Sequence, residues 1–93
     1  MAIQSFKDKD TATFFAGGSV KQWQSIAKSA DRKLVVLDAA TSLKDLAGVP
    51  GNQLEKLSGD RKGQHSIRIN DQWRVCFEWT DKGPINAQIV DYH

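Results

Sequence analysis

Hydrophobic positions follow a helical spacing in the first half of the chain and strict alternation in the second half. Between residues 20 and 37 the apolar side chains recur every three or four positions, which is the spacing of one face of an α-helix. These positions are Val20, Trp23, Ile26, Ala27, Ala30, Leu34 and Leu37. The pattern predicts one core helix of about five turns, and Ser19 with Gln22 suggests a capping box at its start.

Residues 66–80 alternate between apolar and polar side chains. The apolar set is Ile67, Ile69, Trp73, Val75, Phe77 and Trp79. A period of two predicts two strands packed on one side, and Asn70 with Asp71 between them tolerates the left-handed backbone of a tight turn. The sequence therefore predicts a β-hairpin whose second face is polar and carries Arg68 and Arg74.

The remaining elements are expected to be short. They are a strand at residues 2–6, a helix at 11–16 capped by Asp8 or Asp10, a helical turn after Ser42, a strand at 54–57 and a last strand at 85–90. Helices followed by consecutive strands indicate an α+β domain, in which an N-terminal strand and two helices pack on a twisted, mostly antiparallel β-sheet. Residues 1–93 are enough for one domain with one modest core.

Charge narrows the choice of partner only slightly. The chain has 13 Lys and Arg against 11 Asp and Glu, and both signs are spread over its two halves. No basic tail or block indicates a nucleic-acid partner, so any RNA must be bound by a local patch. Lys21, Lys28, Arg32 and Lys33 lie largely off the apolar stripe of the predicted helix, where they form either a solvated face or a contact with a polyanion.

Sequence signals for a metal, a cofactor or a membrane are lacking. One cysteine, Cys76, and two histidines do not make a structural zinc set, and no glycine-rich phosphate loop is present. The first residues do not have the apolar segment of a signal peptide, and no window approaches the ~20 apolar residues of a membrane span. We therefore expect a cytoplasmic protein with no membrane contact and no bound cofactor.

Candidate functional groups gather at the turn before the hairpin, on the hairpin and at the C-terminus. They are Arg61, Lys62, His65, Arg68, Arg74, Asp91, Tyr92 and His93. Antiparallel pairing of the last strand with the hairpin would make them neighbours. Some have structural alternatives, since Arg74 could simply pair with Asp91 or Glu78. His93 combines an imidazole with the α-carboxylate and titrates in the range useful for proton transfer, although chain ends are usually frayed.

Three segments carry a resemblance to a known family. They are residues 59–63 (GDRKG), 66–74 (SIRINDQWR) and 91–93 (DYH). Together they resemble the HigB branch of the RelE/ParE toxin superfamily, and more narrowly the HigB and GraT toxins of Gram-negative bacteria. The likeness extends over essentially the whole chain, and it implies a RelE-like fold and a type II toxin.

The activity implied by the resemblance is ribosome-dependent cleavage of mRNA in the A site of the 30S subunit, which inhibits translation and growth. In that family a ribose 2′-OH attacks the neighbouring phosphate without a metal, which requires a proton acceptor, a proton donor and cations on the developing charge. Carried over position by position, acid and base work falls on His93 and Asp91, nucleotide stacking on Tyr92, and phosphate stabilisation on Arg68 and Arg74.

One position departs from the family pattern. Where some HigB toxins have a further active-site histidine, this chain has Glu55, which can accept a proton but cannot act as a cation. The division of acid and base roles among Glu55, Asp91 and His93 therefore stays open. The groups expected to contact RNA are Arg61, Lys62 and His65 near the hairpin and Lys21, Lys28 and Arg32 on the helix.

The resemblance also implies a partner, a HigA-type helix-turn-helix antitoxin, with operator DNA bound only through that antitoxin. Two other functions remain as alternatives. One is a ParE-like toxin that binds DNA gyrase and catalyses nothing, against which Asp91, Tyr92 and His93 argue. The other is an inactive toxin that persists as a complex-forming co-regulator with its antitoxin.

Overall fold

A computed structural model describes residues 2–92 of the chain. Its α-helices are α1 (Lys9–Phe15), α2 (Ala27–Ala39) and α3 (Leu43–Ala47), and its 3₁₀ turns are η1 (Lys21–Ile26), η2 (Pro50–Asn52) and η3 (Gly59–Arg61). The strands are β1 (Glu55–Lys56), β2 (His65–Arg68), β3 (Trp73–Thr80) and β4 (Gly83–Asp91). They form one antiparallel sheet in the order β1-β2-β3-β4. The predicted α+β class is confirmed.

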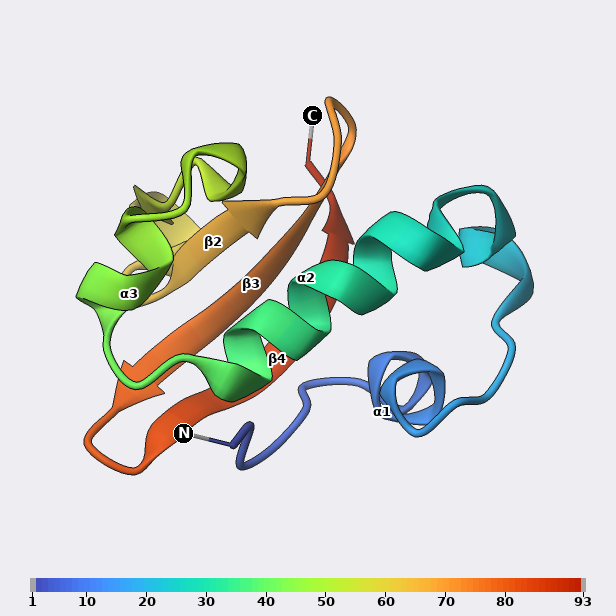
Figure 1. Cartoon of the computed structure of the whole chain (residues 1–93), viewed down its shortest axis with the longest axis horizontal. Coiled ribbons are helices and arrows are strands. Elements are labelled where there is room, and N and C mark those ends of the chain that lie inside the picture. Colours follow the sequence, from blue (N-terminus) through green and yellow to red (C-terminus); the bar gives the residue numbers. More distant parts are fainter. Residues whose placement is uncertain (1, 93) are drawn as a thin grey trace.

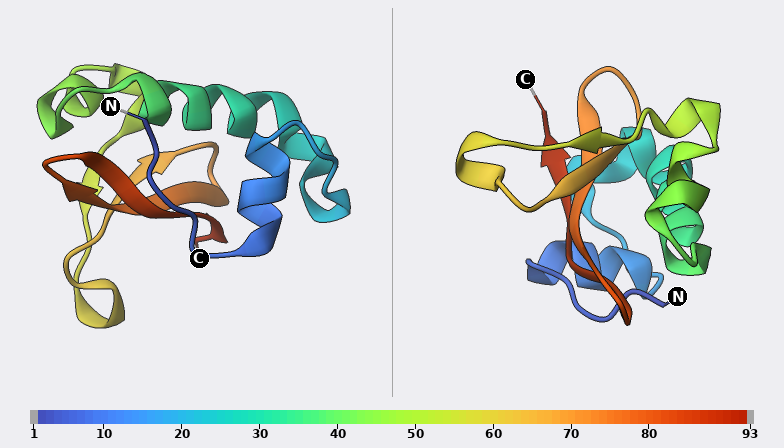
Figure 2. Two further views of the ribbon diagram at one scale, coloured as in Figure 1. Left: turned by 90° about the horizontal axis from the view of Figure 1, so that it is seen from below. Right: turned by 90° about the vertical axis from the view of Figure 1, so that its left-hand side faces the viewer.

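Helix α2 covers one face of the sheet, and α1 stands beside α2 near the β4 edge (Figures 1 and 2). Ala30, Leu34 and Leu37 on α2 are completely buried, as the three-and-four spacing requires. They share one core cluster with the apolar face of the hairpin, which includes Ile67 and Val75. The polar positions of β3 alternate with these, so Arg74 lies on the side of the sheet away from α2.

The predicted hairpin is confirmed, since β2 and β3 pair antiparallel on either side of Asn70 and Asp71. Ile67 of β2 lies opposite Val75 of β3, so both side chains point to the same face of the sheet. The side-chain Oδ1 of Asn70 accepts hydrogen bonds from the backbone N–H groups of Gln72 and Trp73, both at 2.8 Å. This side-chain bonding closes the turn locally, as Asn commonly does.

The predicted long helix is wrong in its first part, because residues 21–26 form the 3₁₀ turn η1 before α2 begins. The capping box is also wrong: the N-cap of η1 is Val20, which makes no side-chain capping bond. Side chains three residues apart lie above one another in a 3₁₀ turn. Trp23 and Ile26 are therefore both buried without an α-helix between them.

The predicted N-terminal strand is reduced to one parallel bridge, between Phe6 and Ala87 of β4. The backbone N–H of Gln4 does donate to the carbonyl of Pro84 at 2.8 Å, so the segment runs alongside β4. Proline has no N–H to return a bond on that edge, and Asn86 adopts a φ of 53°. Both features prevent a continuous ladder.

The short elements agree with their predicted caps. Asp8 is the N-cap of α1, and its Oδ2 accepts from the backbone N–H of Thr11 at 3.1 Å. Ser42 is the N-cap of α3, and its Oγ accepts from the backbone N–H of Asp45 at 3.1 Å. Within residues 2–92 no helix is both long enough and apolar enough to cross a membrane.

Candidate active site

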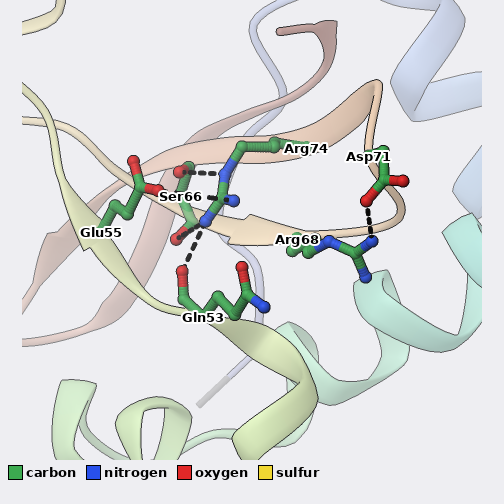
Figure 3. Close-up of polar contacts among 6 residues, drawn as sticks. All are labelled: Gln53, Glu55, Ser66, Arg68, Asp71 and Arg74. Carbon is green, nitrogen blue, oxygen red and sulfur yellow. Dashed lines mark hydrogen bonds and ion pairs between the residues drawn. The ribbon is translucent and has the colours of Figure 1, made fainter.

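Arg74 is a buried cation at the centre of the polar face of the sheet. Only 6% of the residue is exposed. Its Nε donates to Ser66 Oγ at 2.7 Å, and one terminal nitrogen donates to the carbonyl oxygen of Gln53 at 2.5 Å (Figure 3). Neutral acceptors thus hold the guanidinium in one orientation without themselves neutralising its positive charge.

The loop after η2 supplies the second of those acceptors. Gln53 has a φ of 43°, in the left-handed region that non-glycine residues rarely adopt. This conformation directs its carbonyl toward Arg74, so the backbone of one segment fixes a side chain of another. No sequence pattern predicts this contact, because it depends on the conformation of the loop.

Glu55 on β1 is the carboxylate nearest to Arg74, with 3.6 Å between its Oε1 and a terminal nitrogen of Arg74. Sequence reasoning named Asp91 or Glu78 as the structural partner of Arg74, but the ion pair is made by Glu55. Half of the Glu55 side chain remains exposed to solvent. A carboxylate that touches the cation and also reaches solvent is accessible to a ligand.

The end of β4 brings an aromatic ring to the same place. The ring centroid of Tyr92 lies 5.7 Å from Arg74 Cζ, a cation–π distance, and the residue is 38% exposed. The backbone N–H of Tyr92 donates to the carbonyl of Gln72 at 2.7 Å, and Gln72 Nε2 donates to Asp91 Oδ2 at 3.1 Å. The hairpin turn therefore holds Tyr92 beside Arg74 and holds Asp91 beside Gln72. His93 lies outside the described residues.

Arg68 is paired in register with Arg74, yet the two side chains separate. Figure 3 shows Arg74 directed toward Gln53 and Arg68 directed toward Asp71 at the hairpin turn. Arg68 forms an ion pair with Asp71, whose side chain is 99% exposed. Arg68 is thus adjacent to Arg74 in the sheet, but it makes none of the hydrogen bonds that orient the Arg74 guanidinium.

Arg61 extends across the polar face from the turn η3. One of its terminal nitrogens donates to the side-chain oxygens of Gln64 at 3.1 Å and Gln88 at 3.4 Å. Burial raises the pKa of the Cys76 thiol, and the charges of Arg61 and Arg74 oppose that rise. The two guanidinium groups therefore both act on the middle of this face. Lys62, the next residue, is exposed.

His65 is packed on the sheet. Its ring stacks on Phe77 with centroids 6.1 Å apart, and its Nδ1 is buried without a hydrogen-bond partner. Burial, followed by the charge of Lys56, lowers the pKa of His65. Both effects favour the neutral imidazole.

The helix cations are spread along η1 and α2. Lys21, on η1, and the exposed Lys28, in the first turn of α2, belong to the end of the molecule opposite the turn η3 that carries Arg61, whereas the exposed Arg32 lies in the middle of α2 (Figures 1 and 2). The structure thus separates the expected RNA contacts into two groups. Among residues 2–92, no three His, Cys, Asp or Glu side chains are placed to hold a metal ion.

Comparison with known proteins gives the family. A family model described as "RelE-like toxin of type II toxin-antitoxin system HigB" matches residues 4–93. The chain is 40% identical to Toxin HigB-1 of Vibrio cholerae serotype O1 over 91 residues, which cover 96% of this chain and 95% of the relative. The chain belongs to the HigB-like toxin family. The predicted resemblance is confirmed, and the members of this family are the toxins of type II toxin-antitoxin systems.

Two further relatives extend the comparison of this HigB-like toxin. Endoribonuclease HigB of Proteus vulgaris is 32% identical over 93 residues, which cover 98% of this chain and 99% of that one. The solved YoeB-YefM complex from Staphylococcus aureus contains a chain that superposes with a TM-score of 0.61 at 21% identity, with 100% of this chain and 99% of that chain covered. At that identity the structural neighbour shows the shared fold.

Sequence reasoning about this toxin missed two residues that orient Arg74, which are Ser66 and Gln53. Lys33 on α2, one of the cations that the sequence placed off the apolar stripe, donates from its Nζ to Asn52 Oδ1 at 2.8 Å. Ser66 alternates in phase with Arg68 and Arg74, so its position on the polar face was predictable. Gln53 and Lys33 act through contacts with distant segments, for which the sequence pattern carried no signal.

Proposed function

We propose that this HigB-like toxin is an endoribonuclease that cuts mRNA in the ribosomal A site by metal-independent attack of a ribose 2′-OH. The observation that supports this proposal best is the Arg74 centre. It combines a buried guanidinium fixed by neutral acceptors, a half-exposed carboxylate 3.6 Å from it, and an exposed aromatic ring 5.7 Å from it. A phosphate, a proton and a nucleobase are the parts of RNA that these three groups suit.

The reaction assigns one role to each group. The 2′-oxygen forms a bond to phosphorus, the bond from phosphorus to the 5′-oxygen breaks, and the products are a 2′,3′-cyclic phosphate and a 5′-hydroxyl. Glu55 accepts the proton of the 2′-OH, because its carboxylate is exposed enough to meet the substrate. Arg74 stabilises the negative charge that develops on the phosphoryl oxygens, and its fixed orientation avoids reorganisation during the step.

The proton that the 5′-oxygen requires comes from His93, the remaining titratable group expected at this end of the chain. Asp91, which Gln72 holds beside the hairpin turn, takes part in the same proton transfers. Tyr92 presents its ring for stacking on a nucleobase, a contact that every base can make.

The ribosome and an antitoxin complete the proposal. The A site would present the mRNA strand to the Arg74 centre, and rRNA would meet the exposed cations Lys21, Lys28 and Lys62. A HigA-type helix-turn-helix antitoxin would neutralise the toxin and connect it to operator DNA.

Cleavage on programmed ribosomes tests the proposal. We would compare the native protein with Glu55→Gln, Arg74→Lys and a chain lacking His93, and map the cut positions and the new RNA ends with and without a chelator. A control is Lys82→Gln, which removes a charge at the β3–β4 turn, at the other end of the hairpin. We expect the native protein and the control to cut at the A-site codon, with cyclic phosphate ends and no effect of the chelator.

The other outcomes separate the alternatives. Absence of cleavage together with inhibition of DNA gyrase would replace the proposal with the ParE-like function. Absence of both activities, with a stable antitoxin complex, would indicate an inactive co-regulator. Cleavage that stops when metal is chelated would refute the metal-independent mechanism.

A further inference from the structure

Lys33 is a partly buried cation that forms no ion pair with a carboxylate of residues 2–92. It lies on α2, and its Nζ donates to the side-chain oxygen of Asn52 at 2.8 Å. Asn52 is completely buried, and its Nδ2 donates in turn to the carbonyl of Leu46 at 3.1 Å. A buried amide that is itself fixed therefore positions the ammonium group, and the charge of Lys33 is retained.

Two more cations surround Lys33. Burial is the largest cause that lowers the pKa of Lys33, and the charges of Arg32 and Arg68 lower it further. Arg68 reaches this place from β2, and Figure 3 shows its guanidinium on the side of the hairpin near α2. Among residues 2–92 no ion pair joins Arg32 or Lys33 to a carboxylate, and the partner of Arg68 is the almost fully exposed Asp71. Like charges held this close repel one another, so an anion bound among them would be stabilised.

We propose that Arg32, Lys33 and Arg68, the Lys33 cluster, form a second binding site for a backbone phosphate of RNA, separate from the Arg74 centre. This inference rests on the proposed function, since the RNA strand it binds is the one that the Arg74 centre would cut. Arginine suits phosphate because its planar fork can make two parallel hydrogen bonds to two oxygens. Lys33 adds a point charge at a fixed position.

The placement of the cluster favours RNA over an acidic protein segment. Arg68 and Arg74 are directly opposite in the β2–β3 register, so their Cα atoms are about 5 Å apart. The two strand positions are therefore adjacent, although the side chains separate toward Gln53 and toward Asp71, and one extended RNA strand can reach both. The exposed ring of Tyr92 lies over Arg74 on the same route, and it offers a surface for a base between two phosphates.

The test is the salt dependence of RNA binding without cleavage. The probe is a fluorescein-labelled 2′-O-methyl oligoadenylate of about 12 nucleotides, long enough for one small binding site. It has no 2′-OH, so it cannot be cut by the proposed reaction. Fluorescence anisotropy over a range of salt concentrations gives Kd and the slope of log Kd against log salt for the native protein, Lys33→Gln, Arg68→Gln and Lys82→Gln.

We expect Lys33→Gln and Arg68→Gln each to reduce the slope by about 0.7 and to weaken binding about 5–10-fold at ~50 mM salt, the effect of one lost phosphate contact on a single strand. Lys33→Arg keeps the charge and should keep the slope. Lys82→Gln, which removes the same charge at the distant turn, should leave it unchanged. Arg68 does not belong to the buried core, so its variant tests the cluster even if the Lys33 variants fold poorly.

Two results would overturn the inference. Equal slope changes in Lys33→Gln and Lys82→Gln would mean that charge acts without a defined site. An unchanged RNA slope in both Lys33→Gln and Arg68→Gln, with weaker binding of a polyglutamate peptide, would assign the cluster to an acidic protein partner. The proposed function fails separately: a chain that shows the expected slopes but does not cut mRNA on ribosomes keeps this site and loses the nuclease.

Discussion

Replacement of Ser66 by alanine isolates the hydrogen bond that positions Arg74. Ser66 is completely buried, and its Oγ accepts from Arg74 Nε at 2.7 Å. In Ser66→Ala the guanidinium keeps its bond to the Gln53 carbonyl, but Nε faces a methyl group. Because Arg74 is itself buried, water has little access to replace the lost acceptor.

The expected cost follows from the charge of the donor. A hydrogen bond to a charged group contributes about 1.5–3 kcal/mol, and a buried donor without a partner retains its full desolvation penalty. We therefore expect Ser66→Ala to lose about 2 kcal/mol of unfolding free energy. For a domain of this size that loss corresponds to a decrease of about 8–16 °C in Tm. Cleavage should also slow, mainly in kcat, since the guanidinium is no longer held in the orientation that the transition state requires.

Thermal and denaturant unfolding, together with single-turnover cleavage, would measure both effects. The matched control is Ser58→Ala, because Ser58 is an exposed serine that makes no side-chain cap bond at η3, so its loss should stay within about 0.5 kcal/mol. In a double-mutant cycle with Arg74→Met, the two losses should be non-additive by more than about 1 kcal/mol. A Tm decrease in Ser66→Ala as small as that of the control, with unchanged kcat, would refute the positioning role.

Three further variants test other parts of the structure. Asp8→Ala removes the N-cap that Thr11 donates to, and it should cost about 1 kcal/mol without changing cleavage; a Tm equal to the native value would contradict the cap. His65 has a lowered pKa, so the unfolded chain binds its proton more tightly than the folded protein does, and stability should fall as pH decreases through about 6.5. Between about pH 7.5 and pH 5, the Tm of His65→Gln should therefore decrease less than the Tm of the native protein. Equal decreases would show that protonation of His65 does not cause the loss of stability. Glu55→Gln should slow single-turnover cleavage by about 10²–10⁴-fold with little change in Tm, because a half-exposed ion pair contributes at most about 1 kcal/mol; an unchanged rate would move the proton acceptor elsewhere.

The sequence alone determined those elements whose side-chain period matches their backbone. The alternation around Ile67 and Val75 predicted the hairpin and its buried face, because side chains two positions apart on a strand point to the same side of the sheet. The spacing of Ala30, Leu34 and Leu37 predicted the core helix. Local motifs also predicted the caps Asp8 and Ser42, since a cap bond joins residues only three positions apart.

Tertiary structure decided the features that depend on contacts between distant segments. The 3₁₀ turn before α2 satisfies the same three-residue spacing as an α-helix, so the sequence could not separate the two over Trp23 and Ile26. The N-terminal strand is limited by Pro84, which is 80 positions away from Gln4 in the chain.

The candidate site divides in the same way. Sequence motifs predicted Arg74 and Tyr92, and their proximity follows from pairing of β3 with β4. That Glu55 pairs with Arg74, and that Arg68 turns toward Asp71, depends on how β1 and the hairpin turn are placed in three dimensions. A side chain chooses among rotamers by the partners within its reach, and only the folded chain determines which partners those are.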